Sequence, residues 1–312
     1  MTNEEFEEYI TIKEKTIHIS ENISNLSRLG IRYISDMEEL KEYTFLKRLF
    51  FGQNKISEID GLDIFHNLRE LHLNQIWISE LGGLETLSNR EELYLEFNEI
   101  TEIRGLDTLI NLSVLCLMGN EITEIERLDR LKNLNELVLN FNQIDKIKDL
   151  EKFDKLEYLA LRGNHISKII WLNNLTILKK LDISENSITN ISGLENFSNL
   201  QKLSLSHNQL TKISGLELLA NLRELYLDYN QITEITGLDN CVNLEHIDLR
   251  NNRISHISGL GNLEKLEWLY LSGQEKNAPR EIVEELGGLS PVGYALTPQN
   301  FVRYSRQQRN NN

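Results

Sequence analysis

The sequence predicts an α/β solenoid, in which each coil contributes one short strand of a parallel sheet and one short helical turn. Three observations predict this fold. An asparagine recurs at intervals of 22 residues, a fixed frame of apolar residues surrounds it, and the first 278 residues contain no proline. Self-similarity at a period of about 20 to 50 residues is typical of repeat proteins, whose coils stack around one continuous core.

The recurring asparagines define the register of the array. Every interval is 22 residues except the first, which is 44 because Ile76 occupies the intervening position. An amide both donates and accepts, so we expect a structural ladder that satisfies backbone groups where the chain turns out of each strand. The ladder residues are Asn54, Asn98, Asn120, Asn142, Asn164, Asn186, Asn208, Asn230 and Asn252.

The apolar frame changes its period within each coil. Around Asn230 it consists of Leu222, Leu225, Leu227, Ile232, Ile235, Leu238 and Cys241. Alternation before the asparagine is typical of a strand with one buried face, and a spacing of three after it suits 3₁₀ turns. Hydroxyl residues recur three positions after the asparagine position, and we expect them to bond to the backbone. They are Ser57, Ser79, Thr101, Thr123, Ser167, Thr189, Thr211, Thr233 and Ser255.

The complete frame, L-x-x-L-x-L-x-x-N-x-I-x-x-I-x-x-L-x-x-L, resembles the 22-residue class of leucine-rich repeats. This class is found in the regulatory subunit of protein phosphatase 1 and in the internalins. The resemblance covers about Leu46 to Leu271. It implies a right-handed horseshoe, with a parallel sheet on the concave side and short 3₁₀ or helical turns on the convex side. The segment from Gly287 to Tyr304 is loosely similar to the tails of leucine-rich-repeat proteins from Asgard archaea.

The limits of the frame divide the chain into three regions. Residues 1–45 are expected to cap the array with a strand or hairpin over Tyr9–Ser20 and a degenerate coil. Residues 46–273 form the array of 22-residue coils, and residues 274–312 form a helical cap and tail. A solenoid needs such caps because its terminal coils otherwise expose the core. The degenerate coil contains Leu29, Ile34, Met37 and Leu40.

The C-terminal region departs from the frame. The asparagine position is held by Gln274. Pro279 predicts the start of a helix that ends at Gly287-Gly288, and Thr297-Pro298 predicts the N-cap and first residue of a second helix. From Gln307 onward we expect a frayed tail.

The chain is acidic, with 33 Lys and Arg residues against 48 Asp and Glu residues and a net charge of −15. Binding to nucleic acid or to an anionic membrane requires a basic face, so we expect neither. Acidity permits a basic protein partner, but it also simply keeps a long sheet soluble. Met1–Glu8 lacks the features of a signal peptide, and no apolar run reaches the length of a membrane helix, so we expect a cytoplasmic location.

No residue pattern predicts catalysis, a metal site or a cofactor. The seven histidines are scattered, and neither C-x-x-C nor H-E-x-x-H occurs. Asp182, Glu224 and Asp248 form a candidate set of acids, but on an open sheet we expect them to be solvated. Cys116 and Cys241 lie between five and six coils apart, too far for a disulfide, and are expected to be free thiols.

The variable strand positions carry the information about binding, because they project from the exposed face of the sheet. Two zones stand out by their aromatic and apolar residues. The central zone consists of Tyr94, Phe97, Val114, Cys116, Met118, Val138, Phe141 and Tyr158. The C-terminal zone consists of Tyr226, Asp228, Tyr229, Asp248, Arg250, Trp268 and Tyr270. For Phe97 and Phe141, local packing onto the turn is the competing interpretation.

These patterns favour a monomeric, non-catalytic scaffold that binds a partner protein on its concave face. The alternatives are a subunit like the phosphatase regulator, which the resemblance suggests, and an architectural protein that associates with itself. Acidic residues border the central zone, so the partner segment is expected to be apolar with Lys or Arg on its flanks. The bordering residues are Glu92, Glu96, Glu99, Glu102, Glu121, Glu124 and Glu136.

One coil departs from the frame twice. Ile76 replaces a ladder asparagine, and Arg90 occupies a position that leucine holds in the other coils. Isoleucine offers neither a donor nor an acceptor in its side chain, and arginine places a charge among apolar neighbours. We therefore expect this coil to be a weak point of the array.

Overall fold

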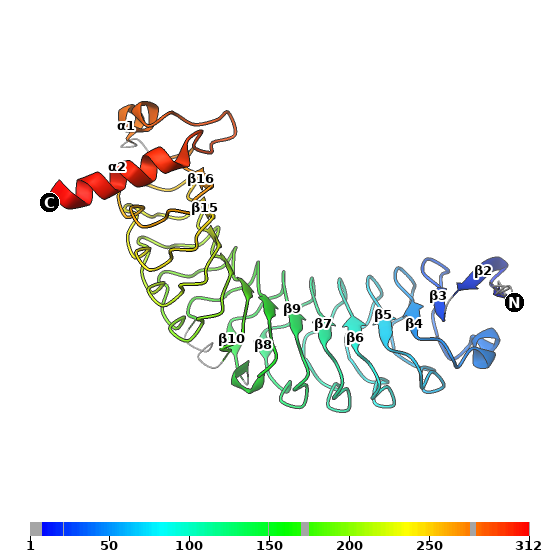
Figure 1. The fold of residues 1–312 in the computed structure, drawn as a ribbon. Helices are drawn as coiled ribbons and strands as arrows, with labels where there is room; N and C mark the ends of the chain where they lie inside the picture. The colour runs from blue at the N-terminus through cyan, green and yellow to red at the C-terminus, as the bar shows by residue number, and fades with distance from the viewer. Residues whose placement is uncertain (1–7, 21, 149, 170–174, 275–278, 312) are drawn as a thin grey trace, which may run out of the picture. The chain divides into compact units, whose positions relative to one another are not determined.

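The computed structural model describes residues 8–20, 22–148, 150–169, 175–274 and 279–311. The chain divides into two compact units, Met1–Lys155 and Leu156–Asn312, each with its own core. Both units are stacks of similar coils, coloured blue to green for the first and green to red for the second (Figure 1). Each unit is described below by itself.

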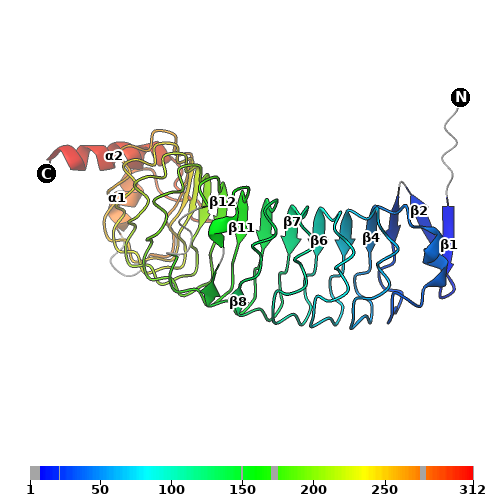
Figure 2. The ribbon, with the colours of Figure 1, turned by 90° about the horizontal axis from the view of Figure 1, so that it is seen from below.

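The first unit begins with antiparallel strands and continues with parallel ones. β1 (Glu8–Ile12) and β2 (Lys15–Ser20) form a hairpin, and β2 pairs with β3 (Ile23–Asn25). From β3 onward each strand pairs in parallel with the strand of the next coil. These strands are β4 (Arg48–Phe50), β5 (Glu70–His72), β6 (Glu92–Tyr94), β7 (Val114–Cys116) and β9 (Glu136–Val138). Figure 2 shows the hairpin at the N-terminal end of the stack.

The second unit contains a parallel sheet and a helical cap. Its strands are β11 (Tyr158–Ala160), β12 (Lys180–Asp182), β13 (Lys202–Ser204), β14 (Glu224–Tyr226), β15 (His246–Asp248) and β16 (Trp268–Tyr270). Each pairs with the next in parallel and in register. After β16 come α1 (Arg280–Glu285) and α2 (Pro298–Asn311).

The core of each unit is a column of aliphatic side chains. The middle residue of every regular strand faces inward, as Leu93, Leu115 and Leu225 do, and is fully buried. The apolar positions after the asparagine, such as Ile122 and Ile125, are also fully buried. Neighbouring coils therefore share one continuous core in each unit, which confirms the solenoid fold predicted from the period of the apolar frame.

The side opposite the parallel sheet contains little helix. Among the described residues it has two 3₁₀ helices, η1 (Glu38–Glu42) and η2 (Leu150–Lys152), and otherwise consists of turns. Two of its segments, β8 (Glu124–Ile125) and β10 (Lys146–Ile147), pair as a small parallel sheet. The spacing of three thus forms isolated turns with i→i+3 hydrogen bonds, such as Leu112 N–H to Leu109 O.

The terminal caps are present, with differences in detail. In the first coil Leu26, Ile31 and Ile34 are buried, whereas Leu29 is half-exposed, so including Leu29 in the apolar frame was wrong. The second helix begins at Pro298 as predicted, but it continues to Asn311, so the expected frayed tail from Gln307 was also wrong. Phe301, Val302 and Ser305 anchor this helix by being buried against the last coils.

The asparagine ladder satisfies the backbone where each strand ends. Asn120 donates from Nδ2 to the carbonyl oxygens of Leu95 and Leu117, both at 3.0 Å, and its Oδ1 accepts the N–H of Ile100 at 3.1 Å. Asn98 also donates to Leu95 O, at 2.9 Å, so that carbonyl receives two amides from adjacent coils. The predicted structural role of the ladder is confirmed, and its bonds connect each coil to the preceding one.

The array extends one coil beyond the last ladder asparagine. Gln274 Nε2 donates to Leu249 O at 2.7 Å and to Leu271 O at 3.0 Å, and its Oε1 accepts the N–H of Ile254 at 3.0 Å. These are the bonds that an asparagine makes in the other coils. The ladder therefore does not lapse at Gln274, because the longer side chain carries the same amide to the same backbone groups.

A second ladder of asparagines, which we did not predict, lies at the turn before several of the strands. Asn89, Asn111 and Asn133 each donate to a backbone carbonyl 23 residues earlier, at 2.8–3.1 Å. In the second unit Asn199, Asn221 and Asn243 do the same at 2.8–2.9 Å. Their 22-residue period is visible in the sequence and could have identified them.

The hydroxyl ladder does not bond to the backbone as we expected. In the part of the chain that the structure describes, the hydroxyls at these positions make no backbone hydrogen bond, and Ser255 Oγ instead contacts His256 Nδ1. All of these residues are exposed or half-exposed. Hydroxyls three residues further on bond to the preceding coil instead, as Thr236 does to Ile213 O at 3.0 Å.

Ile76 leaves the asparagine ladder incomplete. Its side chain is buried, and within the described residues the N–H of Ile56, which an asparagine at this position would accept, has no hydrogen-bond acceptor. The two carbonyls that such an asparagine would bond retain one amide each, since Asn54 donates to Phe51 O and Asn98 donates to Leu73 O. Asn98 accepts the N–H of Ile76 in place of that of Ile78, so among the described residues the N–H groups of Ile56 and Ile78 both lack an acceptor.

We expect Ile76→Asn to raise the free energy of unfolding by about 1–2 kcal/mol, because it supplies the missing acceptor and two further donor contacts. Chemical denaturation followed by circular dichroism measures the change. Ile78→Asn, which buries an amide one frame position later, serves as the control and should destabilise the protein. A midpoint for Ile76→Asn at or below that of the parent would show that the Ile56 N–H is already satisfied.

Arg90 lies inside the core of the first unit, with only 1% of its surface exposed. One nitrogen, Nη2, donates to Phe65 O at 3.0 Å, whereas Nε and Nη1 have no partner. Burial without a counter-ion lowers the pKa of Arg90 to about 9. A buried and incompletely bonded cation is costly, so Arg90 supports the prediction that this coil is a weak point.

Candidate functional site

Three aromatic rings stack across adjacent strands on the exposed sheet face of the first unit. Phe50, His72 and Tyr94 occupy the same position of β4, β5 and β6, with ring centroids 4.3 and 4.2 Å apart and planes inclined by 17° and 5°. The stacking follows from the parallel register, which places equivalent residues one strand spacing apart. The stack holds Tyr94 in place, so it orders the face before any ligand arrives.

Carboxylates fix the polar edges of this stack. Glu70 Oε1 lies 2.7 Å from His72 Nε2, and the Tyr94 hydroxyl donates to Glu92 Oε2 at 2.7 Å. Burial and the hydrogen bond to Glu92 raise the pKa of Tyr94, so its hydroxyl stays protonated. The arrangement positions aromatic surface and negative charge together, and it offers no activated nucleophile.

An apolar surface continues from Tyr94 onto β7 and β9. Val114, Met118 and Val138 are half-buried and contribute to the exposed face. Cys116 is only 7% exposed, so placing it among contact residues was wrong, and burial raises the pKa of its thiol to about 12. Beside it, the Oε2 atom of Glu96 is buried and has no hydrogen-bond partner.

Phe97 and Phe141 lie in the turns that follow β6 and β9, and both keep more than two fifths of their surface exposed. Their φ angles are +56° and +55°, a left-handed conformation that is strained for aromatic residues. Gly119 occupies the equivalent position of the coil between them, and a Cβ there would lie 2.6 Å from the Phe97 ring. Phe97 therefore packs partly on Gly119 while presenting its other side to solvent.

The structure thus divides the central zone. Tyr94, Phe97, Val114, Met118, Val138 and Phe141 contribute accessible surface in the first unit, and Tyr158 begins the sheet of the second unit on β11. For Phe97 both interpretations hold in part, because the ring packs locally and remains half-exposed.

The C-terminal zone lies wholly in the second unit. Tyr229 and Trp268 are exposed, and Tyr226, Asp228, Arg250 and Tyr270 are half-buried. Asp248 differs from expectation, because it is only 2% exposed rather than solvated. Arg250 explains this burial: its Nε donates to both carboxylate oxygens of Asp248 at 3.0 Å, and its guanidinium lies 4.8 Å from the centre of the Tyr270 ring. Asp248 therefore orients Arg250 and is not itself a contact residue.

Two features of the surfaces were missed from the sequence. His246 packs between Tyr226 and Tyr270, and the cap residue Tyr294 meets both Trp268 and Tyr270 edge-on. Trp77 is 57% exposed at the position after the ladder residue, where every other coil has a polar residue. That departure from the frame was the signal for Trp77, whereas the contact of Tyr294 depends on how the cap folds back.

Neither a metal site nor a membrane-spanning helix is found in the ranges that the structure describes. No group of three or more His, Cys, Asp or Glu side chains could hold a metal ion there. No helix among these residues combines the length and the apolar character needed to cross a bilayer. Cys116 and Cys241 are both free thiols, as predicted from their separation in the array.

Two family models of leucine-rich repeats match parts of the sequence. The model described as "Leucine Rich repeats (2 copies)" matches residues 110–152 and 198–240, and the "Leucine Rich Repeat" model matches residues 243–263. Among curated proteins no sequence matches significantly.

Comparison with solved structures finds similar solenoids. An internalin (inlF) from Listeria monocytogenes is 29% identical, with a TM-score of 0.63 over 78% of this chain and 77% of that one. The functional domain of InlJ from the same organism is 22% identical, with a TM-score of 0.67 over 84% of this chain and 56% of that one. A leucine-rich-repeat protein of Leptospira interrogans is 22% identical, with a TM-score of 0.54 over 86% of this chain and 82% of that one. With its matching repeats, asparagine ladder and parallel-sheet coils, this chain is a leucine-rich-repeat protein.

Proposed function

We propose that this protein is a non-catalytic scaffold that binds a partner protein on the exposed sheet face of its first unit. Leucine-rich repeats serve in general as scaffolds for protein interaction. The observation that supports this surface in particular is the ordered stack of Phe50, His72 and Tyr94, continued by the apolar residues of β7 and β9. Contiguous aromatic and apolar surface of this kind is typical of binding sites, whereas scattered apolar residues are not.

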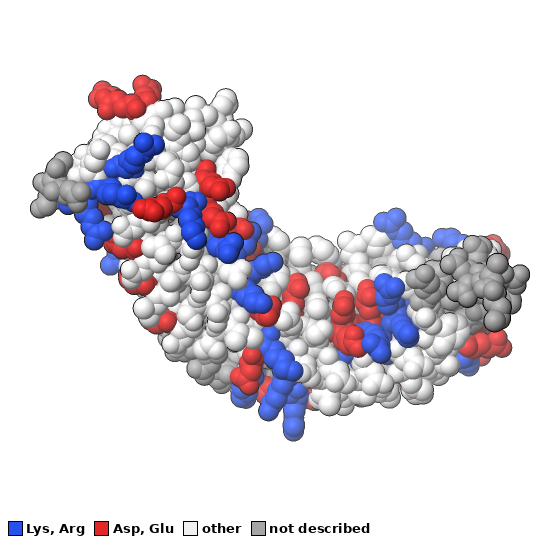
Figure 3. Space-filling model, viewed as in Figure 1, with Lys and Arg blue, Asp and Glu red and all other residues white. Residues whose placement is uncertain are grey.

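The chemistry of this face favours a partner segment that is apolar with basic flanks. Glu70, Glu92, Glu96 and Glu136 lie on or beside it. Within strands β3 to β9 the one Lys or Arg is Arg48, which lies 3.9 Å from Glu70. Both signs of charge are interspersed on the side of the molecule seen in Figure 3, so the net charge alone does not define this surface. A Lys or Arg of the partner would be attracted by the negative charge of these carboxylates.

The surface is ordered before binding. Strand pairing fixes the backbone, and ring stacking and the hydrogen bond to Glu92 fix the side chain of Tyr94. Binding a partner therefore costs little conformational entropy at this surface. The left-handed conformation recurs at this position of other coils, as in Gln53, Gln75 and His207, so it belongs to the repeat. At Phe97 and Phe141 the same turn presents an aromatic side chain. A cytoplasmic location and a monomeric state stay predictions from the sequence.

We expect Tyr94→Ala and Phe141→Ala each to weaken partner binding by about 2 kcal/mol or more, since anchor residues dominate the energy of interfaces. The partner is first captured with the full chain from the native cell and identified by mass spectrometry. Isothermal titration calorimetry with the purified partner then measures each variant, and chemical denaturation checks that the fold is kept.

Trp268→Ala and Tyr226→Ala in the second unit provide the matched aromatic controls. Binding that survives Tyr94→Ala and Phe141→Ala but is abolished by these two variants would place the contact surface in the C-terminal zone. Recovery of only the chain itself would instead support the architectural alternative.

A further inference from the structure

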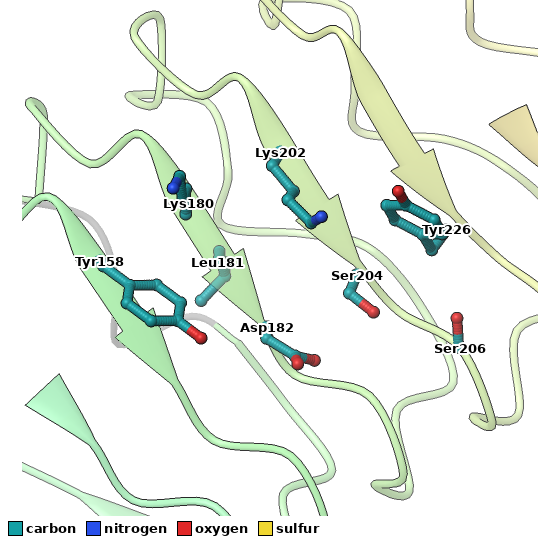
Figure 4. A pocket seen from close by; sticks show the side chains of 8 residues that line it. All are labelled: Tyr158, Lys180, Leu181, Asp182, Lys202, Ser204, Ser206 and Tyr226. Atoms are coloured by element: carbon teal, nitrogen blue, oxygen red, sulfur yellow. The ribbon is translucent and has the colours of Figure 1, made fainter. Parts of the chain in front are cut away.

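The exposed sheet face of the second unit contains a cavity of about 480 Å³ that the proposed function does not use. It lies over β11 to β14, and its walls include Tyr158 on one side and Tyr226 on the other. Figure 4 shows Lys180, Asp182, Lys202 and Ser204 between the two rings. Charged and hydroxyl side chains lie between the two rings of this cavity, whereas apolar side chains form the corresponding surface of the first unit.

Two lysines from adjacent strands line this cavity. Lys180 of β12 and Lys202 of β13 are paired in register, so their side chains leave adjacent strands side by side. Like charges at directly paired positions destabilise a sheet unless an opposite charge lies close by. In a chain with a net charge of −15, such a pair of cations is unexpected.

One of these charges is neutralised and the other is not. Lys202 Nζ lies 2.7 Å from Glu224 Oε2 and 4.9 Å from the centre of the Tyr226 ring. Among the described residues, Lys180 has no acidic group within ion-pair distance, although it is exposed to solvent beside the cavity. The ammonium group of Lys180 is therefore a charge in this cavity without an ion-pair partner among the described residues.

The acid within the cavity does not fill that role. Asp182 Oδ1 accepts both the backbone N–H and the hydroxyl of Ser184, at 3.0 and 2.5 Å, so the carboxylate is held toward the turn after β12. Figure 4 shows Lys180 at the beginning of β12 and the carboxylate of Asp182 at its end. Asp182 would repel an anion placed near that turn and so restricts an acidic group to the lysine side.

We propose that this cavity binds an acidic side chain, Asp or Glu, of an extended segment of a partner protein. The carboxylate would lie between Lys180 and Lys202, where the Ser204 hydroxyl lines the cavity and can donate to it. Tyr158 and Tyr226, at either side, can contact the residues that flank the acid in the peptide. Tyrosine rings contact both backbone and side chains and require no particular sequence. A basic side chain would be repelled by the ammonium of Lys180, which has no acidic partner among the described residues, and is disfavoured.

The site is independent of the surface proposed in the first unit, and its test can be kept separate. A library of random dodecapeptides displayed on phage is selected against the full chain. The recovered peptides are then synthesised with a fluorescent label and measured by anisotropy. We expect one class of peptide to be enriched in Asp and Glu. Its binding should weaken by about three- to fivefold with Lys180→Ala, since an exposed ion pair contributes up to about this factor.

The matched control is Lys212→Ala, which removes an exposed lysine of the same unit outside the cavity. It should change affinity for the acidic peptides less than twofold, as should Tyr94→Ala in the first unit. Peptides in which Asp and Glu are replaced by Asn and Gln should bind the parent chain as weakly as the acidic ones bind Lys180→Ala. Selection without acidic enrichment, or equal affinities for Lys180→Ala and Lys212→Ala, would overturn the proposal.

Discussion

Arg90→Leu is expected to raise the free energy of unfolding by about 2–4 kcal/mol. The parent side chain is buried, and two of its three guanidinium nitrogens have no partner. Folding therefore removes a cation from water, and one hydrogen bond does not offset the desolvation cost. Leucine occupies this position in the other coils and would pack into the same column. Urea denaturation of parent and variant at pH 7 measures the difference.

The gain should depend on pH in a defined direction. Burial lowers the pKa of Arg90 from 12.5 to about 9 in the folded state, so above pH 9 the unfolded chain binds more protons than the folded chain. The stability of the parent therefore rises with pH above about 9, and the advantage of Arg90→Leu shrinks there. Arg69→Leu, which removes an exposed arginine paired with Glu91, is the control and should show no such gain. An unchanged or lowered midpoint for Arg90→Leu would mean that water or rearrangement already satisfies the guanidinium.

Asn120→Leu is expected to lower the free energy of unfolding by about 2–3 kcal/mol. It removes the acceptor of the Ile100 N–H and leaves that buried group unpaired, which carries most of the cost. The carbonyl oxygens of Leu95 and Leu117 still accept hydrogen bonds from Asn98 and Asn142, respectively. These remaining bonds reduce the loss of stability. Denaturation monitored by circular dichroism provides the measurement.

Asn111→Leu is the informative comparison for that variant, because it removes an amide of the exposed asparagine ladder in the same unit. Asn111 donates one hydrogen bond, to Ser88 O at 3.0 Å, and is exposed, so its loss should cost less than about 1 kcal/mol. Equal losses for the two variants would show that the buried bonds of Asn120 do not dominate the stability of the turn.

The fold was predictable because its determinants repeat. The buried middle leucines of the strands and the amides of the ladder recur at a fixed period, and repetition averages out the ambiguity of any single short strand. Asn120 and Asn230 were assigned their role for a physical reason, the need of a turn for both a donor and an acceptor, and the hydrogen bonds confirm it. The same reasoning extended to Gln274 would have found the last coil.

The exposed hydroxyls and the second asparagine ladder show where periodicity is insufficient. Both recur every 22 residues, yet Thr101 points to solvent while Asn111 bonds to a neighbouring coil. Period identifies equivalent positions, but the direction of each side chain depends on the backbone of the turn, which the pattern of residue types does not determine.

The sequence predicted which residues of the candidate surfaces face outward, but it did not predict how their side chains contact one another. Strand alternation identified Tyr94 and Trp268 as outward-facing, whereas the burial of Asp248 depends on a bidentate contact with Arg250 from the same strand end. The stack of Phe50, His72 and Tyr94 required both the register and the ring orientations. Cys116 is buried because its side chain is smaller than those of its neighbours, Tyr94 and Val138, in the same row.

The sharing of carbonyls along the ladder makes the array tolerant of isolated faults but not of consecutive ones. Each strand-end carbonyl receives an amide from its own coil and another from the next, so a lone substitution leaves every acceptor with a donor, as at Ile76. Two substitutions in adjacent coils would strip one carbonyl of both. The array should therefore tolerate several substitutions of ladder asparagines if they are well separated, and fewer if they are adjacent. A substituted coil can be kept where both neighbouring coils have their ladder asparagine.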